Sequence, residues 1–291
     1  MPVAPRAAVL ATLALTFNAF AWGVSWWPLR QLDAAGLHPL WATAMVYALA
    51  VAVITAVRPA AWGELLRTPT LWVLVLAAGT TNASFNWAVT VGDVVRVVLL
   101  FYLMPLWAVL LARLLLHERL TPLAGVRVLL ALIGAAIVLW PEGDGWPLPG
   151  SLPEWLGVLG GFSFALNNVM LRRESHRSEA ARALAMFTGG AVVAGALVLL
   201  MSVQGAAAWP PPPAWAWGLG AVGLALWFLA GNLALQYGAA RLPANATAVV
   251  MISEVLFAAG SAVALGAGVL TPALWVGGVL IVLAGLLASR G

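Results

Sequence analysis

The chain has 291 residues, of which 63% are hydrophobic and only 8% are charged, and it contains no cysteine. Soluble domains carry roughly 25% charged residues, so this composition excludes an ordinary soluble protein and indicates an integral membrane protein. Without cysteine, disulfides, thiol chemistry and cysteine-based metal sites are also excluded. The net charge of +4 comes with basic residues that are all arginine, which we interpret as markers of topology and not as a nucleic-acid surface.

Long apolar stretches predict ten membrane-spanning helices, since one span needs about 20 mostly apolar residues. Charges, prolines and glycines separate the stretches, and the proline run at 210–213 divides the longest one. The first span resembles a signal peptide, but its apolar run is longer than is typical and nine spans follow, so we expect it to be retained. The expected spans are 7–29, 39–57, 69–90, 94–116, 122–141, 153–171, 182–203, 214–237, 244–266 and 272–289.

The arginines predict the orientation of these spans. If the N-terminus is cytoplasmic, eleven arginines fall in inside loops and ends, whereas only Arg30 and Arg96 fall outside. Such a bias is typical of membrane proteins, so we expect both termini in the cytoplasm. At the outer turn between the third and fourth spans, Asp93 and Arg96 are expected to form a surface pair.

The two halves of the chain share residues at an offset of 150. The matched pairs are Leu120-Thr121-Pro122 with Leu270-Thr271-Pro272, Asn82 with Asn232, and Asn86 with Gln236. We interpret residues 1–145 and 146–291 as two five-helix repeats of one integral membrane domain. Because five is odd, the second repeat enters the membrane inverted, which predicts a pseudo-two-fold axis in the membrane plane and a binding site at mid-depth between the repeats.

Short motifs add a family resemblance to this picture. Ten short helices, the run His117-Glu118-Arg119-Leu120-Thr121 after the fourth span and Ser253-Glu254 in the ninth resemble the drug/metabolite transporter superfamily, in particular its EamA-type members. More narrowly, the chain resembles the YddG-type aromatic amino acid exporters of bacterial inner membranes. It departs from the family in having Glu254-Val255 where Glu-Pro is common, and 266–269 in place of a second Glu-Arg motif.

The resemblance implies a secondary transporter of the inner membrane that exports aromatic and other neutral amino acids by alternating access. A multidrug or metabolite transporter of the same fold with other substrates is the alternative. We expect neither an enzyme nor a cofactor, because no nucleophile with a base, paired carboxylates or HExxH motif occurs at membrane depth. A channel is not expected either, since no ring of like charges or carbonyl-rich filter motif appears. The expected partners are the lipid bilayer and small-molecule amino acids, with no nucleic acid.

Amides within the spans are the candidate substrate-binding residues. Asn82 and Asn86 share one helical face, and Asn232 and Gln236 do the same at the matching place. Neutral amides can bind the amino and carboxylate groups of a zwitterion without placing net charge in the bilayer, although they also join helices by hydrogen bonds of about 0.6–2 kcal/mol. We favour cavity lining. From other spans we add Asn18, Trp22, Phe164, Asn167 and Asn168.

Two further residues are candidates for coupling or gating. Glu254 is an acid deep in the ninth span, where an ionised carboxylate is unfavourable by about 2.5–3.5 kcal/mol, so it either serves coupling or forms a structural hydrogen bond. Pro105 removes a hydrogen bond inside the fourth span and predicts a kink, which is either a hinge or a static bend. Gly157 and Gly161 have the spacing of closely packed membrane helices.

Overall fold

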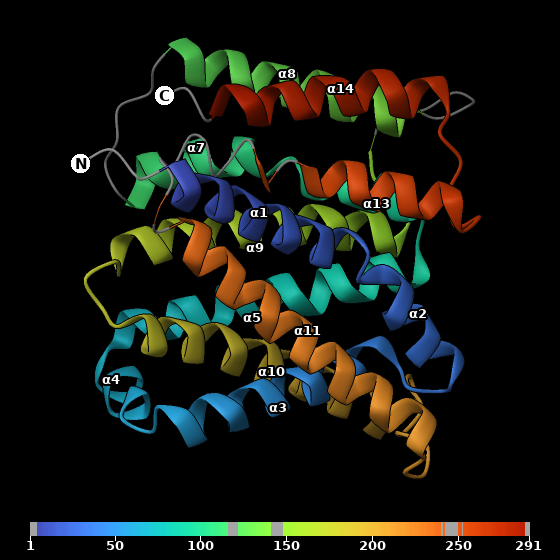
Figure 1. Cartoon of the computed structure of the whole chain (residues 1–291). Helices are drawn as coiled ribbons and strands as arrows, with labels where there is room; N and C mark the ends of the chain where they lie inside the picture. Colours follow the sequence, from blue (N-terminus) through green and yellow to red (C-terminus); the bar gives the residue numbers. More distant parts are fainter. Residues whose placement is uncertain are drawn as a thin grey trace.

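The computed structural model describes residues 5–115, 122–140, 148–239, 241, 250–251 and 253–288 (Figure 1). These residues form helices and their connections, and no strand occurs among them. The run at 117–121 lies outside the described residues. The helices are α1 (Pro5–Gly23), α2 (Trp26–Ala34), α3 (Pro39–Val57), α4 (Ala61–Arg67), α5 (Pro69–Val91), α6 (Val94–Phe101), α7 (Met104–Leu115), α8 (Pro122–Leu139), α9 (Leu152–Arg173), α10 (Glu179–Val203), α11 (Trp215–Ala239), α13 (Ser253–Ala264) and α14 (Pro272–Ala288).

The prediction of an all-helical membrane protein is confirmed. Five helical stretches are long and apolar enough to cross a membrane, namely 9–34, 39–57, 94–115, 179–203 and 217–235. Shorter apolar helices cover 128–138, 253–264 and 272–284. A full set of ten crossings in two inverted repeats stays a prediction.

Two of the expected spans are each divided into two helices, and a proline explains both divisions. The first span breaks at Val24 and Ser25, four and three residues before Pro28, and the fourth breaks at Tyr102 and Leu103, just before Pro105. A proline has no N–H to donate to the carbonyl four residues earlier, and its ring crowds that carbonyl. The kink predicted from Pro105 is therefore a complete break between α6 and α7.

The carbonyl freed by Pro105 is that of Phe101, and it lies against α9. A Cβ built on Gly161 would overlap this carbonyl oxygen, so only glycine allows the approach. One turn earlier, a Cβ on Gly157 would lie 3.0 Å from the Val97 carbonyl oxygen. The close helix packing predicted from Gly157 and Gly161 is thus confirmed.

Long-range packing places segments from the two halves side by side (Figure 1). Helix α5 packs between α9 and α10, α3 packs on α10, and α1 packs on α11 and α13. Helices α8 and α14 form a separate pair at the top of the view. The centre of the molecule is therefore built from both halves of the chain, which is where the predicted site should lie.

At one end of the molecule, Arg96 joins α6 to α9. Its Nη1 lies 2.7 Å from Glu154 Oε1, and its Nη2 donates to the Val138 carbonyl at 2.8 Å. The expected Asp93–Arg96 surface pair takes another form, because the Asp93 carboxylate instead accepts the backbone N–H of Arg96 at 2.8 Å and caps α6. The guanidinium is drawn to Glu154, whose other oxygen accepts the Gly150 N–H at 2.7 Å.

At the opposite end, Glu64 of α4 receives two hydrogen bonds from Ser178, which precedes α10. The Ser178 hydroxyl donates to Oε2 at 2.5 Å and its N–H to Oε1 at 3.2 Å. These bonds hold the pKa of Glu64 below its ordinary value. The contact is therefore retained around neutral pH and lost as the pH falls through that lowered pKa.

Candidate functional site

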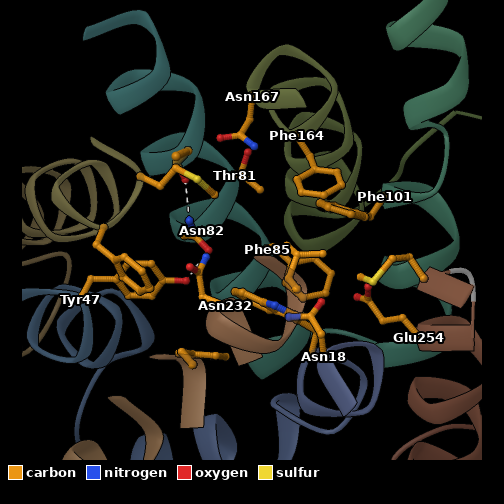
Figure 2. Close-up of a pocket in the computed structure, with 17 residues that line it drawn as sticks. Asn18, Tyr47, Thr81, Asn82, Phe85, Phe101, Phe164, Asn167, Asn232 and Glu254 are labelled. Atoms are coloured by element: carbon orange, nitrogen blue, oxygen red, sulfur yellow. Dashed lines mark hydrogen bonds between the residues drawn. The ribbon is translucent and has the colours of Figure 1, made fainter. Parts of the chain in front are cut away.

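A cavity of about 100 Å³ lies among helices of both halves and reaches α1, α3, α5, α6, α9, α10, α11 and α13 (Figure 2). By this measure a single water needs about 10–15 Å³, so the cavity has room for several waters or part of a small ligand. Its walls combine aromatic rings, amides and one carboxylate, and we describe these in turn.

Asn18 of α1 lines the cavity and carries a hydrogen-bond acceptor without a partner. Its Nδ2 donates to the Gly231 carbonyl at 2.8 Å, which fixes the orientation of the amide. Its Oδ1 is buried and has no hydrogen-bond partner. Asn167 of α9 likewise has a buried Oδ1 without a partner, while its Nδ2 reaches Asn168 Oδ1 at 3.5 Å.

Asn82 of α5 is held from two sides. Its Oδ1 accepts the hydroxyl of Tyr47 from α3, and its Nδ2 donates to the Ala78 carbonyl at 2.7 Å. An amide nitrogen carries two hydrogens, and one of the two of Asn82 is used by the Ala78 carbonyl. Asn232, its expected counterpart from α11, lines the same cavity (Figure 2).

Aromatic rings form most of the remaining wall. Phe101 lies with its ring centroid 4.8 Å from that of Phe85 and 5.3 Å from that of Phe164. Two further lining residues, Trp22 and Phe228, stack on each other with centroids 4.6 Å apart. These separations are typical of favourable aromatic pairs, so the cavity has preformed aromatic surfaces.

Glu254 of α13 supplies the carboxylate, on the side of the cavity away from Tyr47 and Asn82 (Figure 2). Its side chain is buried, and Oε2 accepts the Tyr102 hydroxyl at 3.1 Å. A Cβ on Gly23 of α1 would lie 2.9 Å from the Glu254 carbonyl oxygen, so α1 also packs tightly on α13 at this residue. Among the described residues, no group of three His, Asp or Glu side chains could hold a metal ion.

The structure brings seven of the residues predicted from the sequence to this cavity. These are Asn18, Trp22, Asn82, Phe164, Asn167, Asn232 and Glu254. Asn86 lies outside the lining and donates to Thr43 Oγ1 at 3.2 Å, and Asn168 is exposed. Gln236 and Pro105 belong to α11 and α7, but their side chains lie outside the described residues. Binding and coupling roles for all of these stay predictions.

Tyr47 and Tyr102 were not among the site residues predicted from the sequence. Both lie well inside predicted spans, whereas tyrosines of membrane proteins usually lie at the interface. The chain has only three tyrosines, so depth within a span was a usable signal. The phenylalanines of the wall carry no such signal, because phenylalanine is common throughout membrane helices.

Comparison with known proteins yields three findings. Residues 9–140 match the model of the EamA-like transporter family. An uncharacterized transporter of Pseudomonas aeruginosa is 33% identical over 120 residues, which are 40% of this chain and only 38% of the length of that protein. A crystal structure of another protein aligns with 96% of each chain at a TM-score of 0.54 and 21% identity, which is a likeness of fold alone. The family match covers residues of the first half of the chain only, so both sequence matches are likenesses of part of the chain.

Proposed function

We propose that this chain is a secondary transporter of the EamA-like family that exports aromatic and other neutral amino acids across a bacterial inner membrane by alternating access. The family match supports transport. The observation that carries the substrate class is the lining of the central cavity, which combines unpartnered acceptors, a carboxylate and aromatic walls.

The acceptors favour a ligand that bears an ammonium group. Asn18 Oδ1 and Asn167 Oδ1 are buried without partners, and an unsatisfied buried acceptor is unfavourable by about 1–3 kcal/mol. An ammonium offers three donors and a charge opposite to that of an ionised Glu254. None of the described lining residues is arginine or histidine, so nothing among them repels a cation.

The other walls suit the rest of an amino acid. The second N–H of Asn82 can donate to a substrate carboxylate, while Phe85, Phe101 and Phe164 offer ring faces and edges to an aromatic side chain. Aromatic pairs add about 0.5–1.5 kcal/mol beyond the burial of their area. The ligand that uses all three parts of the lining is an aromatic amino acid.

The helix contacts support the inverted repeats that alternating access requires. If spans one to five correspond to spans six to ten, the α5–α9 contact corresponds to α11–α1, and the α7–α9 contact corresponds to α13–α1. Each of these pairs is in contact. Helices α3 and α10 correspond to each other, as do α8 and α14, and the two helices of each of these pairs are also in contact. Such a pattern is expected around a two-fold axis, with the cavity on the repeat interface.

The purified protein in proteoliposomes should carry saturable flux of L-phenylalanine. Two matched probes separate the amino acid reading from the alternative substrates. Phenethylamine lacks the carboxylate and phenylpropionate lacks the ammonium. We expect phenylalanine to be carried. Phenethylamine should compete weakly with it, and phenylpropionate should compete less than phenethylamine does. Asn18→Leu should reduce phenylalanine flux roughly tenfold, because one acceptor for the ammonium is lost.

Gln204→Leu provides the control for Asn18→Leu, because it removes an exposed amide at the end of α10, away from the cavity. If phenethylamine were carried and phenylalanine were not, the proposed substrate class would change from amino acids to cationic drugs. Equal competition by phenethylamine and phenylpropionate would reject the assignment of the acceptors to an ammonium.

The proposed topology has its own test, which the absence of native cysteine makes direct. Cysteines introduced at Arg177, between α9 and α10, and at Ala206, after α10, lie at opposite ends of α10. In intact cells, a membrane-impermeant thiol reagent should label Ala206→Cys from outside. The same reagent should label Arg177→Cys only after the membrane is permeabilised. Labelling of both positions in intact cells would contradict the proposed orientation.

A further inference from the structure

Tyr102 connects the two halves of the chain at the edge of the cavity. It lies in the turn that separates α6 from α7, and its side chain is buried. Its hydroxyl oxygen lies 3.1 Å from Glu254 Oε2 and 3.3 Å from the Met251 carbonyl oxygen. A single hydroxyl at a helix break of the first half therefore faces two acceptors of the second half.

This geometry satisfies Glu254 in either protonation state. A tyrosine hydroxyl has one hydrogen to donate and can also accept. When Glu254 is ionised, the hydroxyl donates to the carboxylate. When Glu254 takes up a proton from water in the cavity, its new O–H can donate to the tyrosine oxygen, and the tyrosine hydrogen turns to the Met251 carbonyl. In both states the Tyr102 hydroxyl and Glu254 Oε2 are hydrogen bonded to each other.

The residue stands at a point where the backbone can bend. Pro105 interrupts the hydrogen-bond ladder of the fourth span, and Tyr102 and Leu103 form the resulting turn. The Leu103 N–H donates to the Leu100 carbonyl at 3.1 Å and the Leu106 N–H to the Leu103 carbonyl at 3.0 Å, so short local bonds hold the turn. A change at the hydroxyl of Tyr102 acts directly on this turn.

We propose that Tyr102 is a positioning residue that holds Glu254 in both protonation states by turning its hydroxyl between Glu254 and Met251, and that it thereby links the charge of Glu254 to the bend between α6 and α7. The link rests on the proposed transport function, in which Glu254 influences the switch between inward- and outward-open forms. Substrate and proton then act on the same turn.

The surroundings leave Tyr102 as the titratable partner of Glu254 among the described residues. Helix α13 packs against α1 and α6. The charged residue of α1 is Arg6, near the start of that helix, whereas the tight contact with Glu254 comes near its end, at Gly23. The charged residue of α6 is Arg96, whose guanidinium is paired with Glu154. Helix α13 has no other charged residue.

The test compares Tyr102→Phe, which removes only the hydroxyl, with Tyr47→Phe, which removes another buried hydroxyl of the cavity wall. The first measurement is amide hydrogen exchange of the 98–106 segment in the purified protein, which requires no substrate. We expect Tyr102→Phe to speed exchange at Leu103 and Leu106 roughly tenfold, the effect of losing one hydrogen bond to a charged group. Tyr47→Phe should leave these amides unchanged.

The second measurement is the pH profile of L-phenylalanine flux. We expect Tyr102→Phe to shift the profile and to lower the maximal rate more than it changes KM. In combination with Glu254→Gln it should add little, whereas Tyr47→Phe and Glu254→Gln should act independently. A purely structural role for Tyr102 would not move the pH profile.

Unchanged exchange at Leu103 and Leu106 in Tyr102→Phe, or a wild-type pH profile, would overturn the inference. If Tyr102→Phe does not fold, Glu254→Gln tests the same hydrogen bond from the other side and should also speed amide exchange at the turn. An unchanged exchange rate in Glu254→Gln would reject the link between Glu254 and the turn. Wild-type protein that carries no phenylalanine would count against the proposed function, while the exchange result would still decide whether Tyr102 and Glu254 are linked.

Discussion

Gly189→Ala is expected to destabilise the protein by about 1–3 kcal/mol, the usual effect of forcing extra atoms into a closely packed contact. A Cβ at this position would overlap the Val75 carbonyl oxygen and lie 2.9 Å from the Gly79 nitrogen. These are backbone atoms of α5, so no side chain can move aside and the two helices must separate. Helix association in membranes depends on such close approach of small residues. Thermal unfolding in detergent should show a lower midpoint and a lower yield of monodisperse protein.

Gly195→Ala is the matched control, since it makes the same change six residues further along α10. Its Cβ would meet only Ala44 Cβ, at 3.6 Å, which is an ordinary contact. Alanine favours the helix over glycine by about 1 kcal/mol, so this variant should be as stable as the wild type or slightly more so. A Gly189→Ala protein that melts at or above the wild-type temperature would show that α5 and α10 do not pack as closely as described.

Glu254→Gln should lower the maximal rate of phenylalanine flux roughly tenfold or more and flatten its dependence on pH. Glutamine keeps the size and an acceptor oxygen for Tyr102, but it cannot change charge. The rate loss reflects the difference between a charge-assisted and a neutral hydrogen bond at a buried position. Because the lining amides remain, KM should change less than the rate. The measurement is initial flux over a range of pH in proteoliposomes.

Glu179→Gln controls for the removal of an acid elsewhere, because Glu179 is exposed in the first turn of α10. It should leave both the rate and the pH profile as in the wild type. If Glu254→Gln behaved in the same way, the glutamate would only join helices, and transport would depend on the substrate gradient alone.

The positions of helices and of several site residues were predictable because each depends on local sequence. Apolar length and charge placed most helices within a few residues, and the repeat offset pointed to Asn82 and Asn232, which do line one cavity. Pro28 and Pro105 both predict that the span containing them is divided. Only Pro105 was used, and it predicted a kink where the helix in fact breaks.

The contacts that complete the site depend on the three-dimensional path of the chain. Tyr102 and Glu254 are 152 residues apart, and no local pattern brings them together. Asn82 and Asn86 share a helical face, yet one turn separates a lining residue from one that bonds Thr43 between helices. Because these helices are apolar on every side, hydrophobic periodicity does not reveal which face is turned to the cavity.

The contact between the Phe101 carbonyl and Gly161 has a consequence for how this chain can change in evolution. Pro105 has no N–H to donate to the Phe101 carbonyl, and Gly161 provides the space into which this carbonyl projects. An ancestor that acquired the proline without the glycine would have suffered a collision, whereas the glycine alone would have left a gap between α6 and α9. The two positions, 56 residues apart in sequence, should therefore be inherited and replaced together, so that lineages with another residue at 105 are also free to carry a larger one at 161.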